Sequence, residues 1–557
     1  MLVGIDMGGT HIDGVVLKDK KIIKRVKNNV DKNNLYNTIW TTIQELIKDL
    51  NKKEISRINL STTVSTNALV EGKESKVGLI LISGPGRLYD FSNLSENVEF
   101  LSGYVDHRGS IVKDIDLNKV KEVKKRFKAK GIKSVALVSK FSNRNPSFEK
   151  RIYEKLKNDF DHITMGHSLS GKLNFIRRVN TAYLNAAVHS VFSNFVDNIS
   201  KSLKLENIEA SVYILKADAG TMTIKEAKAK PNESILSGPA ASLLGMQALF
   251  KEKEDAILLD IGGTTTDIFL LAKGSPLFEA TGIEIDKKKT LIRAIYSKSI
   301  GIGGDSSISY KDNTIKIGPQ RKDKPMVFGG KYLSPTDAMA ILGYIEVKDL
   351  SKAITDMQKL ADKFNVDYKV MSKIILEEFA RIIYKEVDKT ISKINQKPVY
   401  TIEDLLEGYQ LKPQFLRIIG GPAKILKPYL EEQFTLDAKF PKDYQIANAI
   451  GAALAKPTVA INLHADTERK ILTVSEMNIY KNITANYNLE KAKKKALDLV
   501  EDYGKNLYTD KVKMESEIIE ANSFNMVKGY LGAFRNIRVQ AQIKPGLIYD
   551  LKDDFNE

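Results

Sequence analysis

The sequence GIDMGGTHIDGVVL, at Gly4–Leu17, recurs later in the chain as LLDIGGTTTDIFLL at Leu258–Leu271. Both copies contain the pattern D-x-G-G-T-x-x-D, and in both an apolar run precedes and follows the pattern. Apolar runs separated by a glycine-rich turn predict two strands joined as a hairpin. A single copy is as often plain turn chemistry as a ligand site. Two copies with the same internal spacing, each between predicted strands, indicate that both hairpin tips bind phosphate.

The residue types at the tips support this interpretation. Glycine is expected to let the backbone turn through positive φ and to bring N–H groups close to an anion. Threonine adds a hydroxyl donor, and an aspartate at a strand end can hold a hydrated divalent cation. The predicted nucleotide contacts are Gly8, Gly9, Thr10, His11, Gly262, Gly263 and Thr264. The predicted catalytic carboxylates are Asp6, Asp260 and Asp267, and Asp6 and Asp260 are also predicted to hold Mg²⁺ through its bound water.

Two further glycine pairs point the same way. Gly303 and Gly304 lie downstream of the second hairpin, and Gly420 and Gly421 stand between an apolar strand at Leu416–Ile419 and a helix. A Gly-Gly step between a strand and a helix lets a flat ligand such as adenine approach the backbone closely. All four glycines are therefore predicted to line the nucleotide site. The sequence patterns of the other common nucleotide folds, G-x-x-x-x-G-K-[ST] and a strand-turn-helix G-x-G-x-x-G, do not occur.

Strands and helices alternate along most of the chain, which predicts an α/β fold. The predicted division is an N-terminal domain at residues 1–180, a second domain at residues 181–456 and a small α+β domain at residues 457–557. The last of these combines short strands with one strongly charged helix. Two long helical segments are predicted inside the second domain, at Pro335–Phe364 and Val370–Ile394.

Composition excludes several classes of protein. The chain has 557 residues, a formal net charge of +17 and no cysteine, which excludes disulfide scaffolds, thiolate nucleophiles and cysteine-ligated metal sites. Its basic residues are spread over amphipathic stretches such as Lys119–Lys130 without a nucleic-acid reader motif, so no nucleic-acid partner is expected. The chain shows neither a cleavable leader nor a long apolar run, which predicts a cytoplasmic protein without a membrane partner.

The repeated hairpin resembles the ATP-binding superfamily of actin, hexokinase and the heat-shock chaperones. That resemblance implies two ribonuclease H-like, actin-like ATPase domains, each with a phosphate hairpin, around an interdomain nucleotide cleft. It also implies ATP as the nucleotide, together with Mg²⁺.

Several stretches resemble one branch of that superfamily, the hydantoinase A and 5-oxoprolinase family. Besides the two hairpins, they are STTVSTNALVEGKESKVGLI at Ser61–Ile80, FSNRNPSFEKRI at Phe141–Ile152, GHSLSGKLNFIRRVNTAYLNAAV at Gly166–Val188 and ILSGPAAS at Ile235–Ser242. The resemblance implies ATP-dependent opening of a cyclic amide, a hydantoin or a 5-oxoproline-like lactam, by phosphorylation of the carbonyl oxygen. It also implies a hydantoinase B-like partner, which this chain does not contain.

Polar residues after a predicted strand are candidates for substrate binding. Thr62, Thr63, Thr66 and Asn67 are placed to face a small polar substrate, but Ser/Thr clusters after strands are as often loop and cap residues, so both interpretations stay open. Ser237, at the start of a predicted helix, fits an N-cap better than a ligand contact.

Two histidines and an asparagine are weaker candidates. His162 and His167 lie five residues apart, a poor spacing for one helix face, which favours surface or core roles. Related carboxylase subunits bind a metal in this neighbourhood, so the family resemblance keeps Asn145 and His167 as secondary metal candidates.

Two other functions would use the same nucleotide cleft and stay open at this stage. One is an ATPase that remodels or reactivates a partner protein through domain closure. The other is a small-molecule kinase, which needs a carboxylate base beside an acceptor hydroxyl. The sequence does not separate the base from the cation ligands among the aspartates. It also leaves the oligomeric state open, a homodimer included.

Overall fold

The computed structural model describes residues 1–9, 11–31, 34–86, 89–279, 281–311, 314–319, 321–396, 409–508, 514–527 and 533–552. Its contacts divide the chain into two units, and each unit is described by itself. Unit 1 contains Met1–Ala241, Glu279–Ala294 and Ala452–Asp550, and unit 2 contains Ser242–Phe278, Ile295–Gly451 and Leu551–Glu557. These divisions differ from the predicted domain limits at residues 180 and 456, because two strands within residues 211–223 return to the first sheet of unit 1.

The first sheet of unit 1 carries the N-terminal hairpin. In spatial order its six strands are β12 (Thr221–Thr223), β11 (Ser211–Leu215), β4 (Arg57–Ser61), β1 (Leu2–Met7), β2 (His11–Lys18) and β3 (Lys21–Asn29). The strands β1, β2 and β3 form an antiparallel meander, whose first two strands are the predicted hairpin. The strand β4 runs parallel to β1, and β11 runs parallel to β4. The carboxyl ends of β1, β4 and β11 therefore lie at one edge of the sheet.

Two helices cover one face of this sheet. Val3, Ile5 and Ile58 are fully buried against α1 (Leu35–Ile47) and the C-terminal half of α5 (Phe175–Leu205). Apolar residues at every second position of β1 produce this buried face, since successive side chains of a strand point to opposite sides.

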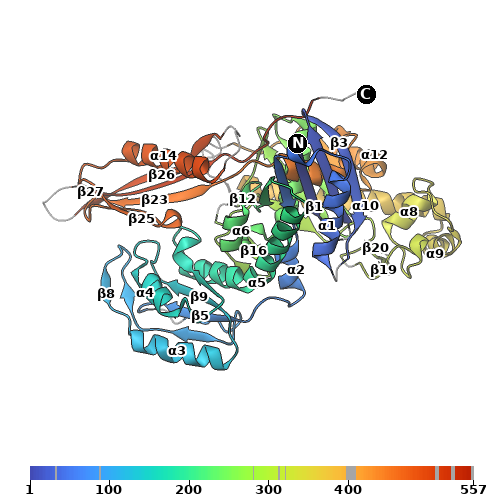
Figure 1. The fold of residues 1–557 in the computed structure, drawn as a ribbon. Coiled ribbons are helices and arrows are strands. Elements are labelled where there is room, and N and C mark those ends of the chain that lie inside the picture. Colours follow the sequence, from blue (N-terminus) through green and yellow to red (C-terminus); the bar gives the residue numbers. More distant parts are fainter. Residues whose placement is uncertain are drawn as a thin grey trace. The chain divides into compact units, whose positions relative to one another are not determined.

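A second, fully parallel sheet of unit 1 lies against the other half of α5. In spatial order it contains β10 (His162–Met165), β9 (Ser134–Ser139), β5 (Val77–Ile82) and β6 (Val98–Phe100). The helices α3 (Leu117–Ala129) and α4 (Ser147–Leu156) cover its other face. Figure 1 shows α5 beside both sheets of unit 1. Because the two halves of α5 are buried on different partners, this helix lacks a single apolar stripe.

Residues after 456 form an antiparallel sheet in unit 1. In spatial order it contains β25 (Ile479–Asn482), β24 (Ile471–Val474), β23 (Ala460–Asp466), β27 (Ala533–Ile543) and β26 (Ser516–Val527), and α14 (Leu489–Leu507) packs on it. The predicted combination of short strands and one charged helix corresponds to this sheet and to α14. The sheet and the helix share one apolar core, to which Tyr213 of β11 also belongs.

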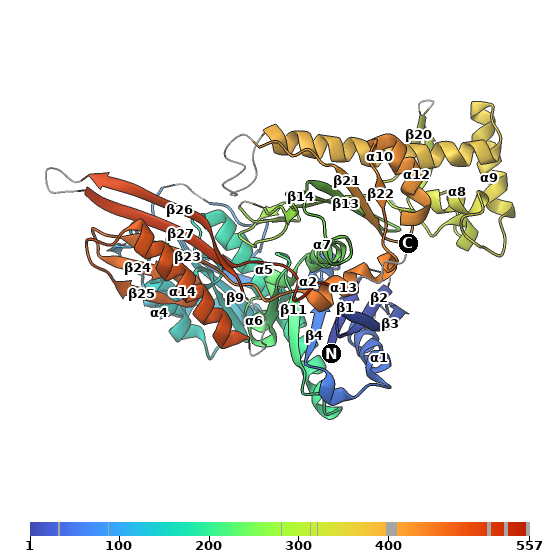
Figure 2. The ribbon, with the colours of Figure 1, turned by 90° about the horizontal axis from the view of Figure 1, so that it is seen from above.

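Unit 2 is built on the sheet that carries the second hairpin. In spatial order this sheet contains β15 (Ser275–Pro276), β14 (Thr266–Ala272), β13 (Ala256–Ile261), β21 (Phe415–Ile419) and β22 (Ala438–Lys439), and β18 (Ser297–Ile300) also pairs with β14. The strand β13 runs antiparallel to β14 and parallel to β21, which repeats the arrangement of β1 with β2 and β4. Figure 2 shows the long helix α10 (Tyr368–Gln396) along this sheet, with which it shares one apolar core.

One predicted helix of unit 2 is wrong. The segment Pro335–Phe364 is predicted to be a single helix, but the structure divides it into α8 (Pro335–Ile341) and α9 (Ser351–Ala361). Gly343, directly after α8, has a φ of 82°. Helices commonly end where a glycine adopts this left-handed conformation, since glycine has no Cβ to oppose it.

The described elements together form a mixed α/β fold. The remaining helices and strands are α2 (Val64–Val70), β7 (Tyr104–Val105), β8 (Ile111–Lys113), α6 (Ile224–Ala229), α7 (Ser237–Phe250), β16 (Glu284–Ile285), β17 (Lys288–Lys289), β19 (Ile308–Lys311), β20 (Thr314–Ile317), α12 (Ala423–Phe434) and α13 (Ala447–Leu454). Among the helices that the structure describes, none combines the length and the apolar character needed to cross a membrane.

Candidate functional site

The β1–β2 hairpin of unit 1 places Asp6 opposite Asp13. Beyond this pair, the amide of Gly8 donates to the carbonyl oxygen of His11 over 2.9 Å, which closes the turn. Asp6 is buried, and Asp13 accepts a hydrogen bond from Lys27 Nζ at 2.8 Å. Burial raises the pKa of Asp13, although Lys27 opposes the shift. Two carboxyl groups therefore lie at the base of the first tip.

The β13–β14 hairpin of unit 2 has the same geometry. Asp260 lies opposite Asp267, and the amide of Gly262 donates to the carbonyl oxygen of Thr265, again over 2.9 Å. Each copy of the sequence motif thus produces the same register and the same closing hydrogen bond. The two predicted hairpins are confirmed.

The backbone conformation of the glycines at the tips differs from the prediction. Positive φ is expected at them, but Gly8, Gly9, Gly262 and Gly263 are all absent from the described residues with positive φ. In each tip the first glycine, Gly8 or Gly262, instead donates its amide to the closing hydrogen bond. The amides of Gly8 and Gly262 are used inside the hairpins, whereas among the described residues no backbone hydrogen bond from the amide of Gly9 or Gly263 is found.

The other predicted contacts at the tips are exposed or lie outside the described residues. Thr10 is outside the described ranges, whereas His11 and Thr264 are described and exposed. A Cβ added at Gly9 would meet no atom within 4 Å, so the first tip is open to a ligand.

A loop of unit 2 supports the second tip. The amide of Gly304 donates to the carbonyl oxygen of Gly262 at 3.0 Å, and the amide of Asp305 donates to that of Gly263 at 2.7 Å. A Cβ added at Gly303 would lie 2.5 Å from the carbonyl carbon of Gly263, so this position requires glycine. Gly303 and Gly304, which are predicted to contact the nucleotide, therefore hold the hairpin in place.

Asp305 is a charged residue at this tip that the sequence prediction missed. Its Oδ2 lies 2.9 Å from the point where a Cβ on Gly263 would stand, so the carboxylate faces the tip. Its Oδ1 accepts from Thr336 Oγ1 at 3.0 Å, and Arg321 forms an ion pair with Oδ2 at 3.3 Å. The signal in the sequence is its position directly after a Gly-Gly pair.

The two aspartates of the second hairpin, Asp260 and Asp267, lie in different environments. Ser242 Oγ donates to Asp260 Oδ2 over 2.7 Å. Burial, together with the neighbouring charge of Asp260, raises the pKa of Asp267 to about 6, although a hydrogen bond from Ser299 opposes the shift. A carboxyl group with a pKa this close to neutrality is suited to accept a proton during a reaction.

We expect the carboxyl carbon of Asp267 to titrate in ¹³C NMR with a midpoint near 6. Asp260→Asn removes the neighbouring negative charge and is expected to lower that midpoint. Because the pKa is raised in the folded protein, protonated Asp267 stabilises the fold relative to ionised Asp267. This contribution to the free energy of unfolding is greatest below the ordinary value of 3.8 and is lost as the pH rises through about 6. A midpoint at or below 3.8 in the wild type would contradict the assignment.

The glycine pair after β21 has two different roles. Gly420 adopts a φ of 95°, and a Cβ there would lie 2.2 Å from the carbonyl oxygen of Ile261. Gly420 is therefore needed for packing against the second hairpin. A Cβ added at Gly421 would meet no atom within 4 Å, which leaves the backbone at this position open to a flat ligand.

The four substrate candidates surround the start of α2, at the edge of the sheet where β1 and β4 end. Thr62 is buried, and its Oγ1 accepts from the amide of Val64 at 3.2 Å. Thr63, Thr66 and Asn67 are partly exposed, and Asn67 Nδ2 donates to Thr63 Oγ1 at 3.3 Å. Helical spacing places these three residues on one side of α2. Thr62 thus has a structural role, and the other three stay candidates for substrate contact.

The segment that leads into α7 fixes the start of α2. Ser237 is the first helical residue of α7 rather than the predicted N-cap, and its Oγ donates to the carbonyl oxygen of Thr62 at 3.3 Å. The amide of Leu236 donates to Thr66 Oγ1, also at 3.3 Å. The Ser-Gly-Pro-Ala stretch therefore positions the substrate candidates.

The histidine and asparagine candidates have structural partners. His167 Nδ1 lies 2.6 Å from Glu149 Oε2, and both side chains are buried. The His162 ring stacks on that of His189, with 3.5 Å between centroids. Asn145 Nδ2 donates to a backbone carbonyl at 2.8 Å. Within the described ranges no three His, Asp or Glu side chains gather as metal ligands would, so the secondary metal candidates gain no support.

Comparison with known protein families identifies the chain. The model of the hydantoinase/oxoprolinase family matches residues 178–461, which is more than half of the chain, and the model of the family's N-terminal region matches residues 2–160. The chain belongs to the hydantoinase/oxoprolinase family. The resemblance found in the sequence is thereby confirmed, and each hairpin lies within one of the two matched segments.

Two curated relatives of this hydantoinase/oxoprolinase chain carry named activities. The acetophenone carboxylase gamma subunit of Aromatoleum aromaticum is 22% identical over 480 residues, which are 75% of this chain and 63% of the relative. The 5-oxoprolinase of Saccharomyces cerevisiae is 25% identical over 403 residues, which are 68% of this chain and 30% of the relative. The chain therefore spans less than two thirds of the length of either relative.

A solved structure shows that the fold of this hydantoinase/oxoprolinase chain is shared. The crystal structure of the ATP-dependent caprolactamase from Pseudomonas jessenii superposes with a TM-score of 0.73 at 18% identity. The match covers 98% of this chain and 88% of the caprolactamase chain.

Proposed function

We propose that the protein is an ATP-dependent hydrolase that opens a cyclic amide of the hydantoin or 5-oxoproline-like lactam kind. The observation that carries the proposal is the pair of hairpins with one register and one closing hydrogen bond, in a chain of the hydantoinase/oxoprolinase family. Glycine tips beside carboxylates suit phosphate groups and their cation. We also propose that both hairpins bind the same ATP molecule.

ATP would supply the activation that ring opening needs. A cyclic amide resists attack by water because its carbonyl is stabilised by resonance. Transfer of the terminal phosphoryl group to the carbonyl oxygen releases ADP and makes the carbon more electrophilic. Water then attacks this carbon, the C–N bond breaks, the nitrogen takes up a proton and phosphate leaves. In phosphoryl transfer the protein contributes mainly positioning and electrostatic stabilisation.

The roles of the acidic residues follow from their environments. Mg²⁺ keeps several of its waters and is usually bound through one or two carboxylates, which fits Asp6 and Asp260 better than a cage of protein ligands. Asp267 is proposed as the group that accepts a proton, because burial raises its pKa to about 6. Phosphate contacts are proposed for Gly9 and Gly263, whose amides are not used inside the hairpins.

The remaining assignments concern the adenosine part of ATP and the ring substrate. Gly421 is proposed to face the adenosine, since its backbone is open, while Gly420 supports it. Thr63, Thr66 and Asn67 are proposed to bind the ring substrate, since these three side chains are polar and partly exposed.

A hydantoinase B-like partner is part of the proposal. The acetophenone carboxylase relative is named as a subunit, and this chain covers only 30% of the yeast 5-oxoprolinase. A remodelling ATPase and a small-molecule kinase are less favoured, because the relatives that carry names act as an oxoprolinase, a caprolactamase or a carboxylase.

The test is ATP hydrolysis by the purified protein, alone and with the product of a neighbouring hydantoinase B-like gene, against a panel of lactams, hydantoins and ketones. One ring compound is expected to raise ATP turnover by at least about tenfold. Mass spectrometry is expected to show the ring-opened product. A phosphorylated acceptor as the final product would instead establish a kinase, and stimulation only by a copurifying protein would establish a remodelling ATPase.

A further inference from the structure

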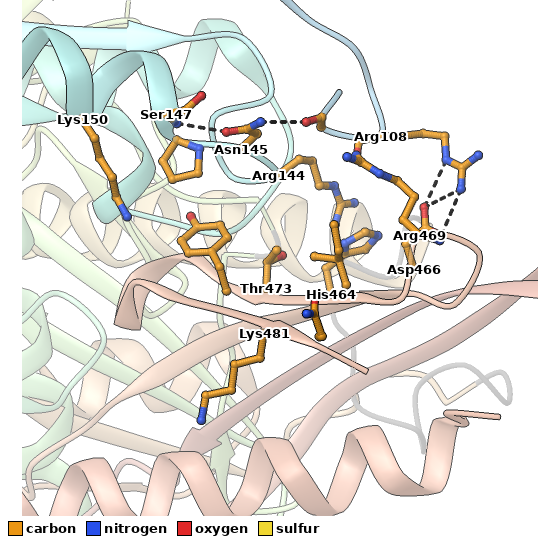
Figure 3. Close-up of a pocket in the computed structure, with 15 residues that line it drawn as sticks. Arg108, Arg144, Asn145, Ser147, Lys150, His464, Asp466, Arg469, Thr473 and Lys481 are labelled. Carbon is orange, nitrogen blue, oxygen red and sulfur yellow. Dashed lines mark hydrogen bonds and ion pairs between the residues drawn. The ribbon is translucent and has the colours of Figure 1, made fainter. Parts of the chain in front are cut away.

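A cavity of about 390 Å³ opens in unit 1 between the start of α4 and the C-terminal sheet. Its lining residues come from the β7–β8 turn, from the segment that leads into α4 and from β23, β24 and β25, so neither hairpin contributes to it. Figure 3 shows these side chains gathered around the cavity. The cavity is therefore separate from the residues assigned to ATP.

Basic side chains dominate the lining. The cationic ones are Arg108, Arg144, Lys150, Arg469 and Lys481, whereas Asp466 is the single carboxylate among the lining residues. Asp466 forms an ion pair with Arg108, with 2.8 Å between Arg108 Nη2 and Asp466 Oδ2. Glu468 also forms an ion pair with Arg108, at 2.7 Å. The other cationic side chains give the cavity an excess of positive charge.

Arg144 is the most informative of these residues. Arg144 is only 8% exposed. Its Nε has no hydrogen-bond partner in the described part of the chain, and no described carboxylate forms an ion pair with its guanidinium. Burial lowers the pKa of Arg144 to about 9, and the nearby charge of Arg538 adds to the effect, although the charge of Asp466 opposes it. A buried guanidinium that forms no direct ion pair is costly to the fold. A bound anion would remove this cost.

Two further polar atoms of the lining lack partners among the described residues. They are Nε2 of His464, a residue that is 9% exposed, and Oγ of Ser147. Ser147 is the first residue of the ten-residue helix α4; its amide donates to Asn145 Oδ1 at 3.1 Å, and the N-cap residue Pro146 has no side chain that could cap the helix. The N-terminal end of a helix favours negative charge. In Figure 3 Arg144 extends toward His464, with Ser147 on the α4 side of the cavity.

We propose that this cavity binds a phosphate group, either inorganic phosphate or the phosphoryl group of a small metabolite. A tetrahedral dianion accepts hydrogen bonds from several directions, which matches donors on the loop before α4, on α4 itself and on β23. A planar carboxylate carries one charge and offers two oxygens in one plane, so it would satisfy fewer of these groups. A volume of about 390 Å³ also leaves room for an organic moiety beside the phosphate.

Calorimetric titration of the full chain with inorganic phosphate tests the proposal. Arg144→Met keeps a side chain of similar length without charge and is expected to raise the Kd for phosphate by at least about tenfold. Arg151→Gln is the control, because Arg151 lies on α4, just after the segment that contains Arg144, but pairs with Asp114 and does not line the cavity. Phosphate bound at the hairpins contributes equally in all three proteins, so the difference reports on the cavity alone.

Thermal unfolding provides a second measurement on the same proteins. Without phosphate, Arg144→Met is expected to have a higher Tm than the wild type, because it removes a buried and unpaired charge. Phosphate is expected to raise the Tm of the wild type and of Arg151→Gln by more than that of Arg144→Met. Equal phosphate-induced shifts in all three proteins would overturn the proposal.

A third variant and a choice of anions complete the test. His464→Phe keeps an aromatic ring but removes Nε2, and it is expected to weaken phosphate binding several-fold. If both cavity variants bind phosphate as the wild type does, the proposal is wrong. Glycerol 3-phosphate binding more tightly than inorganic phosphate would identify a phosphorylated metabolite as the ligand, and the reverse order would identify free phosphate. Acetate binding as tightly as phosphate would contradict the choice of a tetrahedral dianion.

Discussion

An Asp260→Asn protein is expected to hydrolyse ATP on the order of 10²–10³-fold more slowly than the wild type. The substitution keeps the size of the side chain and an oxygen that can accept from Ser242 Oγ, which now donates to Asp260 Oδ2. It removes the negative charge proposed to hold a magnesium-bound water beside the phosphates. Turnover is measured at saturating Mg-ATP, with nucleotide affinity measured separately by titration.

Asp6→Asn is expected to cause a similar loss, because the first hairpin has the same register and the same closing hydrogen bond. Asp437→Asn in unit 2 is the control, since the side chain of Asp437 is exposed and forms an ion pair with Lys439 at 3.6 Å. Wild-type turnover and affinity in Asp260→Asn or in Asp6→Asn would contradict the assignment of that residue.

Gly420→Ala is expected to lower the free energy of unfolding of unit 2 by about 3 kcal/mol. Gly420 has a φ of 95°, a conformation that alanine rarely adopts, and the new Cβ would lie 2.2 Å from the carbonyl oxygen of Ile261. Relief of this clash must displace β21 from the end of β13. Chemical denaturation monitored by circular dichroism measures the change.

Gly421→Ala is the matched partner of this variant. Its Cβ would meet no atom within 4 Å, so the change in the free energy of unfolding is expected to stay within about 0.5 kcal/mol. Its affinity for ATP is expected to fall, because the methyl group would occupy the space proposed for adenosine. Equal stability of the two variants would show that Gly420 is not needed for packing, and unchanged ATP affinity in Gly421→Ala would remove this residue from the site.

The parts of the fold that the sequence predicts well are those encoded by local spacing. In D-x-G-G-T-x-x-D the two aspartates stand where a hairpin pairs them, so the motif determines both the register and the closing hydrogen bond. The predicted strand at Leu416–Ile419 likewise coincides with β21 to within one residue, because an apolar run ends at a Gly-Gly pair.

The parts that the sequence does not predict depend on contacts between distant segments. Gly303 requires glycine because it packs on the backbone of Gly263, and Asp305 is a site candidate only because the same loop brings its carboxylate to the hairpin tip. The cavity around Arg144 joins residues near 144 with residues near 464, and no linear motif links them. A periodic pattern also cannot show that Gly343 interrupts a helix, since helices tolerate isolated glycines.

Titration of the wild-type chain with Mg-ATP tests the central claim most directly, when it is repeated on Asp6→Asn and Asp260→Asn. If both hairpins hold one triphosphate, the wild type will bind one ATP per chain, and a change in either hairpin will weaken that single binding event. Two independent nucleotides per chain, or affinity that is unaffected by a change in one of the hairpins, would contradict it.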